Sequence, residues 1–132
     1  MKNITRIGVY GVARKGHEIL LVTQTSGPYA SLLDLPGGGI EFGETIEQAL
    51  RREFLEEVGM TFDSMELITN LTSLIHMPAK ANSPSGTLHR IGLIYSVTGL
   101  RTVQTGSELK YQWIDARTLQ EHSVTPFVWS SL

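Results

Sequence analysis

Three glutamates, Glu53, Glu56 and Glu57, lie close together in the segment EFLEEVG. Residues three and four apart share one face of a helix, so Glu53 would lie beside both Glu56 and Glu57. Like charges at this spacing destabilise a free surface helix, whereas a divalent cation would be coordinated by them. Carboxylates suit Mg²⁺ or Mn²⁺ rather than zinc, and Mg²⁺ in proteins commonly binds substrate phosphates as well. The spacing therefore predicts a metal site for a phosphate-bearing substrate.

The same segment carries the signals of a well-defined helix. Thr45 and Gln48 have capping-box spacing, and Gly59 stands where a left-handed C-terminal residue is wanted. Apolar residues recur at three- and four-residue steps and predict a buried face of Ile46, Ala49, Leu50, Phe54 and Val58. A solvated helix with an acidic patch is the alternative. The preceding glycine turn at 36–39, the upstream Glu44 and the third acid favour the metal site.

Residues Gly38 to Met60 match the pattern G-x5-E-x7-R-E-U-x-E-E-x-G-U, where U is a bulky apolar residue, at all nine constrained positions. A chance match of this length is improbable, and the segment resembles the Nudix box. The resemblance implies an α/β protein with the Nudix fold, an α/β/α sandwich with a mixed central sheet, as a single Nudix hydrolase domain over residues 1–132. It also implies Mg²⁺-dependent hydrolysis of a nucleoside diphosphate linked to another moiety.

Carried over to this sequence, the resemblance implies roles for the residues of the box. Glu53, Glu56 and Glu57 would be metal ligands. The carbonyl of Gly37 or Gly38 would be a further ligand. Arg52 would orient the glutamates through a salt bridge, and Glu44 would support the loop or an outer-sphere water.

Glu108 is the most interesting acid outside the box. It precedes Trp113 by five residues, in the loop before a predicted strand. Many Nudix chains have an acid here that serves as an extra ligand or as the general base, and the alternative is a solvated loop glutamate. Glu56 and Glu53 are the other candidates for the base, because a metal-bound water needs only a nearby carboxylate to accept its proton.

Candidate substrate contacts include aromatic and histidine side chains outside the box. With Glu44 they are Tyr29, His76, His89 and Phe127. Aromatic rings can stack on a base, and the two histidines flank the loop at 78–86. An ordinary structural role is the alternative for each. Leu33 replaces a common family tryptophan and no arginine follows the strand at 18–23, so the specific substrate is left open.

Composition agrees with a small enzyme. The chain has 132 residues, enough for one domain with one core. Its net charge of −2 gives no basic surface for nucleic acid, and the absence of cysteine excludes disulfides and thiolate metal sites. No apolar run is long enough to span a membrane, and residues 1–6 do not open a signal peptide. We therefore expect a cytoplasmic protein that acts on a small-molecule nucleotide, with no nucleic-acid or membrane partner, and leave a homodimer open.

The remaining sequence predicts the elements that position the box. Strands are expected over 4–13, 18–23, 65–75, 89–97 and 111–114, with a hairpin turn at 15–16 and loops at 27–35 and 78–86. Asp115 would cap a short helix that ends at Leu119 or Gln120. Pro126 would begin a last helical turn.

Two classes of function are compatible with these features. The first is a hydrolase of nucleoside diphosphate derivatives, and the second is a non-catalytic nucleotide-binding or regulatory Nudix module. All acids of the box are present, which favours the hydrolase. An isomerase of isoprenoid diphosphates shares a similar box, but this chain has no cysteine to serve as its proton-transfer residue.

Overall fold

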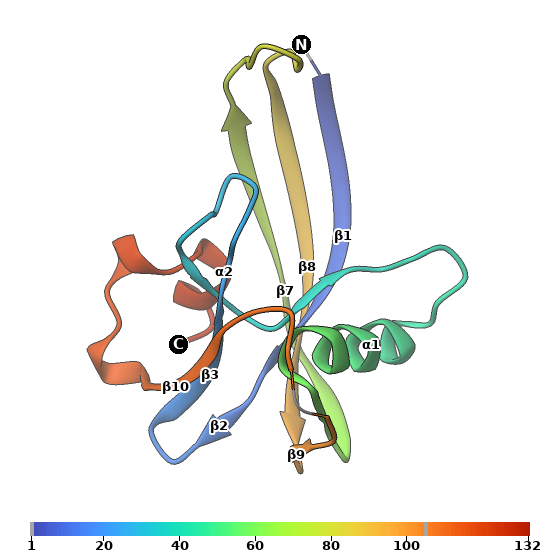
Figure 1. Cartoon of the computed structure of the whole chain (residues 1–132), viewed down its shortest axis with the longest axis vertical. Coiled ribbons are helices and arrows are strands. Elements are labelled where there is room, and N and C mark those ends of the chain that lie inside the picture. Colours follow the sequence, from blue (N-terminus) through green and yellow to red (C-terminus); the bar gives the residue numbers. More distant parts are fainter. Residues whose placement is uncertain (1, 105) are drawn as a thin grey trace.

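The computed structural model describes residues 2–104 and 106–132, and its strands are flanked by helices (Figure 1). The first sheet has the strand order β5-β1-β8-β7. Its strands are β1 (Lys2–Val12), β5 (Gly37–Gly39), β7 (Ser64–Met77) and β8 (Gly86–Thr98). Strands β1 and β8 are parallel, and the other pairs are antiparallel, so the sheet is mixed.

The second sheet has the order β10-β3-β2, and β4 pairs with β3. Its strands are β2 (Arg14–Lys15), β3 (Glu18–Thr23), β4 (Leu33–Asp34) and β10 (Tyr111–Asp115). The predicted hairpin is formed by β2 and β3, and Gly16 adopts a positive φ of 57° in its turn. Strands β6 (Met60–Thr61) and β9 (Arg101–Thr102) form a separate pair.

Two hydrophobic cores lie on opposite faces of the sheets, because neighbouring strand residues point in opposite directions. Leu20 and Val22 of β3 belong to the core under α1 (Ile46–Val58). Ile19 and Leu21 belong to the core under α2 (Pro126–Trp129). Short 3₁₀ turns, η1 (Ala116–Thr118) and η2 (Glu121–Ser123), precede α2. The expected α/β/α arrangement with a mixed sheet is confirmed.

Two departures from the sequence predictions concern the segments on either side of the glycine turn. Residues 27–35 are not entirely loop, because Leu33 and Asp34 form β4 and pair with Thr23 and Val22. A strand of two residues is too short to show an alternating pattern. Ile46 was predicted to be buried but is 37% exposed, because it begins the helix beside the projecting loop that follows β5.

Strands β1, β8 and β7 extend as a long ribbon beyond the layered part of the molecule (Figure 1). Strand β7 forms one edge of this sheet. Among the described residues, no helix has the length and apolar character needed to cross a membrane.

Candidate active site

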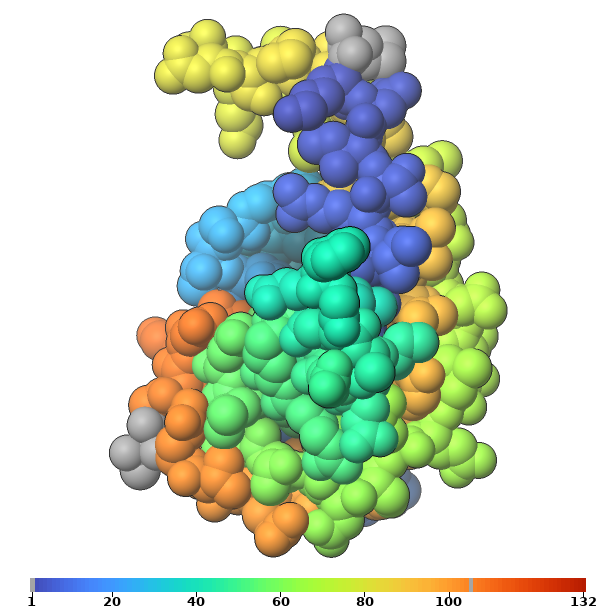
Figure 2. All heavy atoms as spheres, turned by 90° about the vertical axis from the view of Figure 1, so that its right-hand side faces the viewer, coloured from blue at the N-terminus to red at the C-terminus, as the bar shows by residue number. Residues whose placement is uncertain are grey.

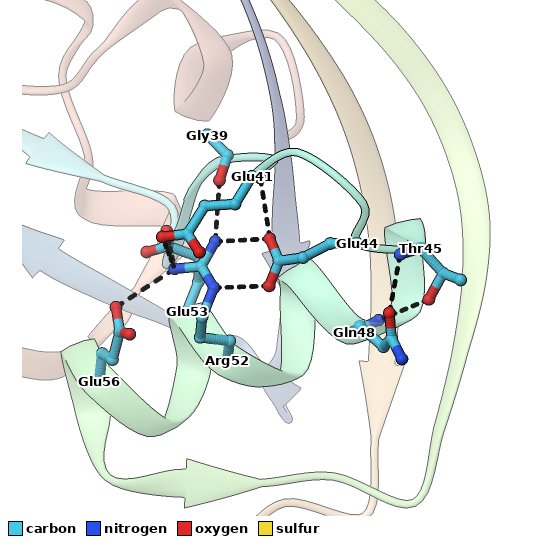
Figure 3. Close-up of polar contacts among 8 residues, drawn as sticks. All are labelled: Gly39, Glu41, Glu44, Thr45, Gln48, Arg52, Glu53 and Glu56. Carbon is cyan, nitrogen blue, oxygen red and sulfur yellow. Dashed lines mark hydrogen bonds and ion pairs between the residues drawn. The ribbon is translucent and has the colours of Figure 1, made fainter.

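The box helix begins and ends where its sequence predicts. Thr45 caps α1: its hydroxyl accepts from the amide of Gln48 at 3.1 Å, and the Gln48 side chain accepts from the amide of Thr45 at 2.9 Å (Figure 3). Gly59 ends the helix in the left-handed region, with φ 66°. These caps fix both termini, so the spacing between the acids and the glycine strand β5 is set by local sequence.

Arg52 is the centre of an ion-pair network on α1 (Figure 3). Its guanidinium donates to both carboxylate oxygens of Glu44, at 2.7 and 2.9 Å, and to the carbonyl of Gly39 at 3.0 Å. It also donates to Glu53 at 2.9 Å and to Glu56 at 3.3 Å. The Arg52 guanidinium therefore joins the loop after β5 to two of the predicted ligands, in line with the orienting role that we expected.

Glu44 is fully engaged in this network. Besides the paired contact with Arg52, its carboxylate accepts from the amide of Glu41 at 2.8 Å. Hydrogen bonds from Arg52 and then from Glu41 lower the pKa of Glu44 to about 2. This geometry supports the loop-supporting role of Glu44 rather than the substrate contact that we also considered.

Glu57 lies on the other side of the cluster, against the glycine strand. Its carboxylate accepts from the amide of Gly37 at 2.9 Å. Burial is the main cause that raises the pKa of Glu57 to about 8; the hydrogen bond from the Gly37 amide lowers this pKa, and the nearby charge of Glu53 adds to the rise. Burial also raises the pKa of Glu53, against the lowering effect of Arg52.

Two glycines of β5 allow the strand to lie close to the carboxylates of Glu53 and Glu57. Gly37 has φ 147°, and a Cβ there would lie 2.2 Å from the carbonyl oxygen of Val9. A Cβ on Gly38 would lie 2.8 Å from the carboxyl carbon of Glu53. Because these glycines have no side chains, the backbone of β5 lies directly beside the carboxylates of Glu53 and Glu57.

Glu108 joins the cluster through the loop before β10. The amides of Glu108 and Leu109 donate to the carbonyls of Glu56 and Glu57, at 3.0 and 3.3 Å. They satisfy carbonyls of the last helical turn that have no partner within the helix. The negative charge of Glu108 raises the pKa of both Glu53 and Glu57, so its carboxylate acts on these acids. The position of Glu108 in a loop did not by itself indicate that it lies close to Glu53 and Glu57.

The donor set fits a hard divalent cation. Glu53, Glu56 and Glu57 lie in the second half of α1, and the backbone of Glu108 is tied to its last turn; burial makes the ionised forms of Glu53 and Glu57 unfavourable. Within the described residues, no three acid or histidine side chains converge closely enough to enclose an ion. Arg52 holds Glu53 and Glu56, and the amide of Gly37 holds Glu57, so the acids are neighbours without the convergence predicted from helical spacing.

A cavity of about 330 Å³ adjoins the acids. Figure 2 shows its mouth as a recess between β1, the loop after β3 and the loop after β5. Glu53 and Glu57 line one part, and Tyr29 and Arg90 line another. A larger cavity of about 550 Å³, between β2, β8 and β10, has Arg14 and Lys15 but no carboxylate in its described lining. We therefore place the candidate site in the smaller cavity.

The other predicted substrate contacts do not gather there. His76 and His89 line two separate surface hollows, and His89 pairs with the Thr5 hydroxyl at 3.3 Å. His89 follows Leu88 and precedes Arg90, which both line the cavity, so strand alternation directs His89 to the opposite face. Phe127 is 1% exposed and packs edge-on against Tyr10, so it belongs to the core rather than to the cavity wall.

Sequence reasoning missed two charged residues of the cavity. Asp34 is fully buried, and Arg90 is 8% exposed. The signal was a charged residue set among apolar neighbours, in LDLPGG for Asp34 and in HRIGLIYSV for Arg90. Charged residues are seldom buried unless paired, so each such position predicts a buried partner without saying which one.

Comparison with known proteins agrees with the geometry of the site. A family model described as the NUDIX domain matches residues 2–130. The chain belongs to the NUDIX family. It is 34% identical over 94 residues to the ADP-ribose pyrophosphatase of Methanocaldococcus jannaschii, covering 70% of this chain and 52% of that protein.

Other NUDIX relatives carry different substrate names. The chain is 39% identical over 67 residues to the 8-oxo-dGTP diphosphatase of Escherichia coli K12, covering 50% of this chain and 52% of that protein. It is 33% identical over 97 residues to the nucleoside triphosphatase NudI of E. coli O139:H28, covering 68% of this chain and 66% of that protein. The chain thus spans about half the length of the first two of these three relatives.

Solved structures share the fold. A MutT NUDIX hydrolase from Burkholderia pseudomallei superposes with a TM-score of 0.70 at 22% identity, covering 97% of this chain and 95% of that one. A MutT protein from Bacillus halodurans also gives 0.70 at 22% identity, covering 95% and 78%. At this identity the likeness concerns the fold alone.

Proposed function

We propose that the chain is a Mg²⁺-dependent hydrolase that cleaves the diphosphate bond of a nucleoside diphosphate linked to another moiety. Nucleoside triphosphates and nucleotide sugars are substrates of this type. The observation that carries the proposal is that Glu53 and Glu57 line one cavity, while Glu56 lies on the same helix and the backbone of Glu108 is hydrogen-bonded to its last turn. The names of the relatives, which are nucleotide diphosphatases and a triphosphatase, support the same class of reaction.

In this proposal the glutamates bind the metal ion, and Arg52 positions two of them. Glu53, Glu56 and Glu57 would hold Mg²⁺, or Mn²⁺, together with a backbone carbonyl of Gly37 or Gly38. When bound, the ion neutralises negative charge on the diphosphate. Arg52 keeps Glu53 and Glu56 in place through its contacts at 2.9 and 3.3 Å.

A carboxylate must accept the proton of the attacking water. Glu108 suits this task because its backbone is tied to the last turn of α1 while its side chain is exposed to solvent. Glu56 is the alternative, since its side chain is 43% exposed and lies on the same turn. The site thus has both acids that bind and an acid that can exchange a proton with water.

A screen of nucleoside triphosphates and nucleoside diphosphate derivatives, with Mg²⁺ and with EDTA, tests the proposal. We expect turnover with Mg²⁺ only, and water labelled with ¹⁸O should place its label on phosphorus. Label on a sugar carbon would refute diphosphate cleavage. Tight nucleotide binding without turnover would instead identify a non-catalytic module. The variant Glu66→Gln, an exposed acid on β7, serves as the control for Glu57→Gln, which should abolish turnover.

A further inference from the structure

The buried carboxylate of Asp34 holds together the cavity wall opposite the acids. Its oxygens accept hydrogen bonds from the Leu35 amide at 2.8 Å, the Thr125 hydroxyl at 2.8 Å and the Gln24 amide group at 3.0 Å. Arg90 adds a fourth bond through Nη2 at 3.4 Å. With four donors around its two oxygens, Asp34 has little capacity left to accept a hydrogen bond from a ligand.

Arg90 has a donor that this network does not use. Its Nη1 atom is buried and has no hydrogen-bond partner among the described residues. Its guanidinium carbon lies 4.3 Å from the ring centre of Phe127 and 5.0 Å from those of Tyr10 and Tyr29. Buried donors normally have partners, so an unpaired one on a residue that lines a cavity indicates an acceptor that reaches Nη1 once the surrounding side chains shift to expose it.

The charge of Arg90 is already balanced by Asp34. The guanidinium and the carboxylate form a buried ion pair, with Asp34 fully buried and Arg90 8% exposed. A phosphate placed here would leave an extra negative charge in a poorly hydrated site that also contains Glu53 and Glu57. The spare donor therefore suits a neutral acceptor, such as a carbonyl oxygen, better than an anion.

Tyr29 gives this part of the cavity a flat surface. Its half-buried ring lines the cavity, and its hydroxyl contacts the hydroxyl of Ser73 at 3.4 Å. Aromatic rings of this kind stack on nucleobases. Glu53, Glu57, Tyr29 and Arg90 all line one cavity. A nucleotide with its phosphates beside the two glutamates would therefore extend its base toward Tyr29 and Arg90.

We propose that Arg90 determines base specificity, by donating from Nη1 to the carbonyl oxygen of a nucleobase that stacks near Tyr29. Guanine O6 and thymine O4 are such oxygens. In place of guanine O6, adenine has an amino group, to which Nη1 cannot donate and which Asp34 is too saturated to accept, while the acceptor N7 is common to both purines. This inference rests on the proposed nucleotide hydrolase function. It predicts that adenine nucleotides are the poorest substrates.

The test compares the wild type with Arg90→Lys, which retains a positive charge for Asp34 but loses the planar guanidinium. Turnover with Mg²⁺ is measured for dGTP, dTTP and dATP, and binding of GMP, TMP and AMP is measured by calorimetry in EDTA. Arg117→Lys is the matched control, because Arg117 also forms an ion pair with an aspartate, Asp115, at 2.7 Å, but lies outside the described lining of the cavity.

We expect the wild type to prefer a carbonyl-bearing base over adenine by about tenfold or more in kcat/KM and in affinity, and Arg90→Lys to lose that preference. Arg117→Lys should keep the wild-type preference. Equal use of adenine by the wild type would overturn the proposal. So would an Arg90→Lys variant that is less stable and less active but keeps the wild-type ratio, since that describes a purely structural arginine. If no triphosphate is hydrolysed, the proposed function fails, and the binding ratios in EDTA still decide the role of Arg90.

Discussion

Replacing Glu57 by glutamine should stabilise the metal-free protein in alkaline solution. The side chain amide can still accept from the Gly37 amide, but it carries no charge to bury. In the wild type, burial raises the pKa of Glu57 from 4.5 to about 8. A carboxyl whose pKa is raised in the folded state stabilises the protein below its unfolded pKa, and that stability is lost as the pH rises toward 8.

The size of the effect follows from the two pKa values. A rise from 4.5 to about 8 corresponds to about 5 kcal/mol of folding free energy, of which about 4 kcal/mol is lost by pH 8. The difference in unfolding free energy between Glu57→Gln and the wild type should therefore be small at pH 4.5 and grow to a few kcal/mol at pH 8. Because the proposed Mg²⁺ site uses the ionised carboxylates, added Mg²⁺ should stabilise the wild type more than Glu57→Gln and so reverse the order of the two stabilities.

Urea unfolding between pH 4.5 and 9, with EDTA and with Mg²⁺, measures both effects. Glu66→Gln is the control, because Glu66 is exposed on β7, and its profile should follow the wild type. A free-energy difference between Glu57→Gln and the wild type that does not change with pH would refute the reasoning. It would mean that the Glu57 carboxylate is solvated or compensated in the folded protein.

Three further predictions concern other parts of the site. Glu108→Gln should lower turnover by about two to four decades with little change in the thermal midpoint, and unchanged turnover would assign the base to Glu56. Gly38→Ala should weaken Mg²⁺ affinity about 10- to 100-fold in a calorimetric titration, because a Cβ would displace the Glu53 carboxylate. Gly39→Ala is the control, because its Cβ would meet open space and should leave the affinity unchanged. Equal affinities of the two variants would contradict this prediction. Thr45→Ala should cost about 0.5–2 kcal/mol in urea unfolding through loss of the helix cap, and no measurable cost would show that the capping box adds nothing.

The parts of the site that sequence predicts well are local. The caps of α1 lie within five residues of the groups they satisfy, and the box pattern places Glu44, Arg52 and the acids on one short segment. Helical geometry then determines which of them can meet. The pattern does not specify rotamers, so it did not indicate that Glu53 and Glu56 would both contact Arg52 while Glu57 contacts the amide of Gly37.

The remaining parts depend on pairings between distant segments. Asp34 and Arg90 are 56 residues apart, and Asp34 and Thr125 are 91 apart, so neither contact has a local signature. His89 shows a different limit. Its place beside a loop suggested a substrate contact, but the register of β8 directs it away from the cavity, and only alternation counted from the buried Arg90 could have indicated this.

The hydrogen bonds around Asp34 have a consequence for the order of folding. They join β4, β8 and the residue before α2, so the carboxylate is satisfied only after three segments have closed long loops. Each closure costs chain entropy, and a charge buried before its partners arrive is strongly unfavourable. We therefore expect this network to assemble after the folding transition state. Weakening it should speed unfolding while leaving the refolding rate nearly unchanged.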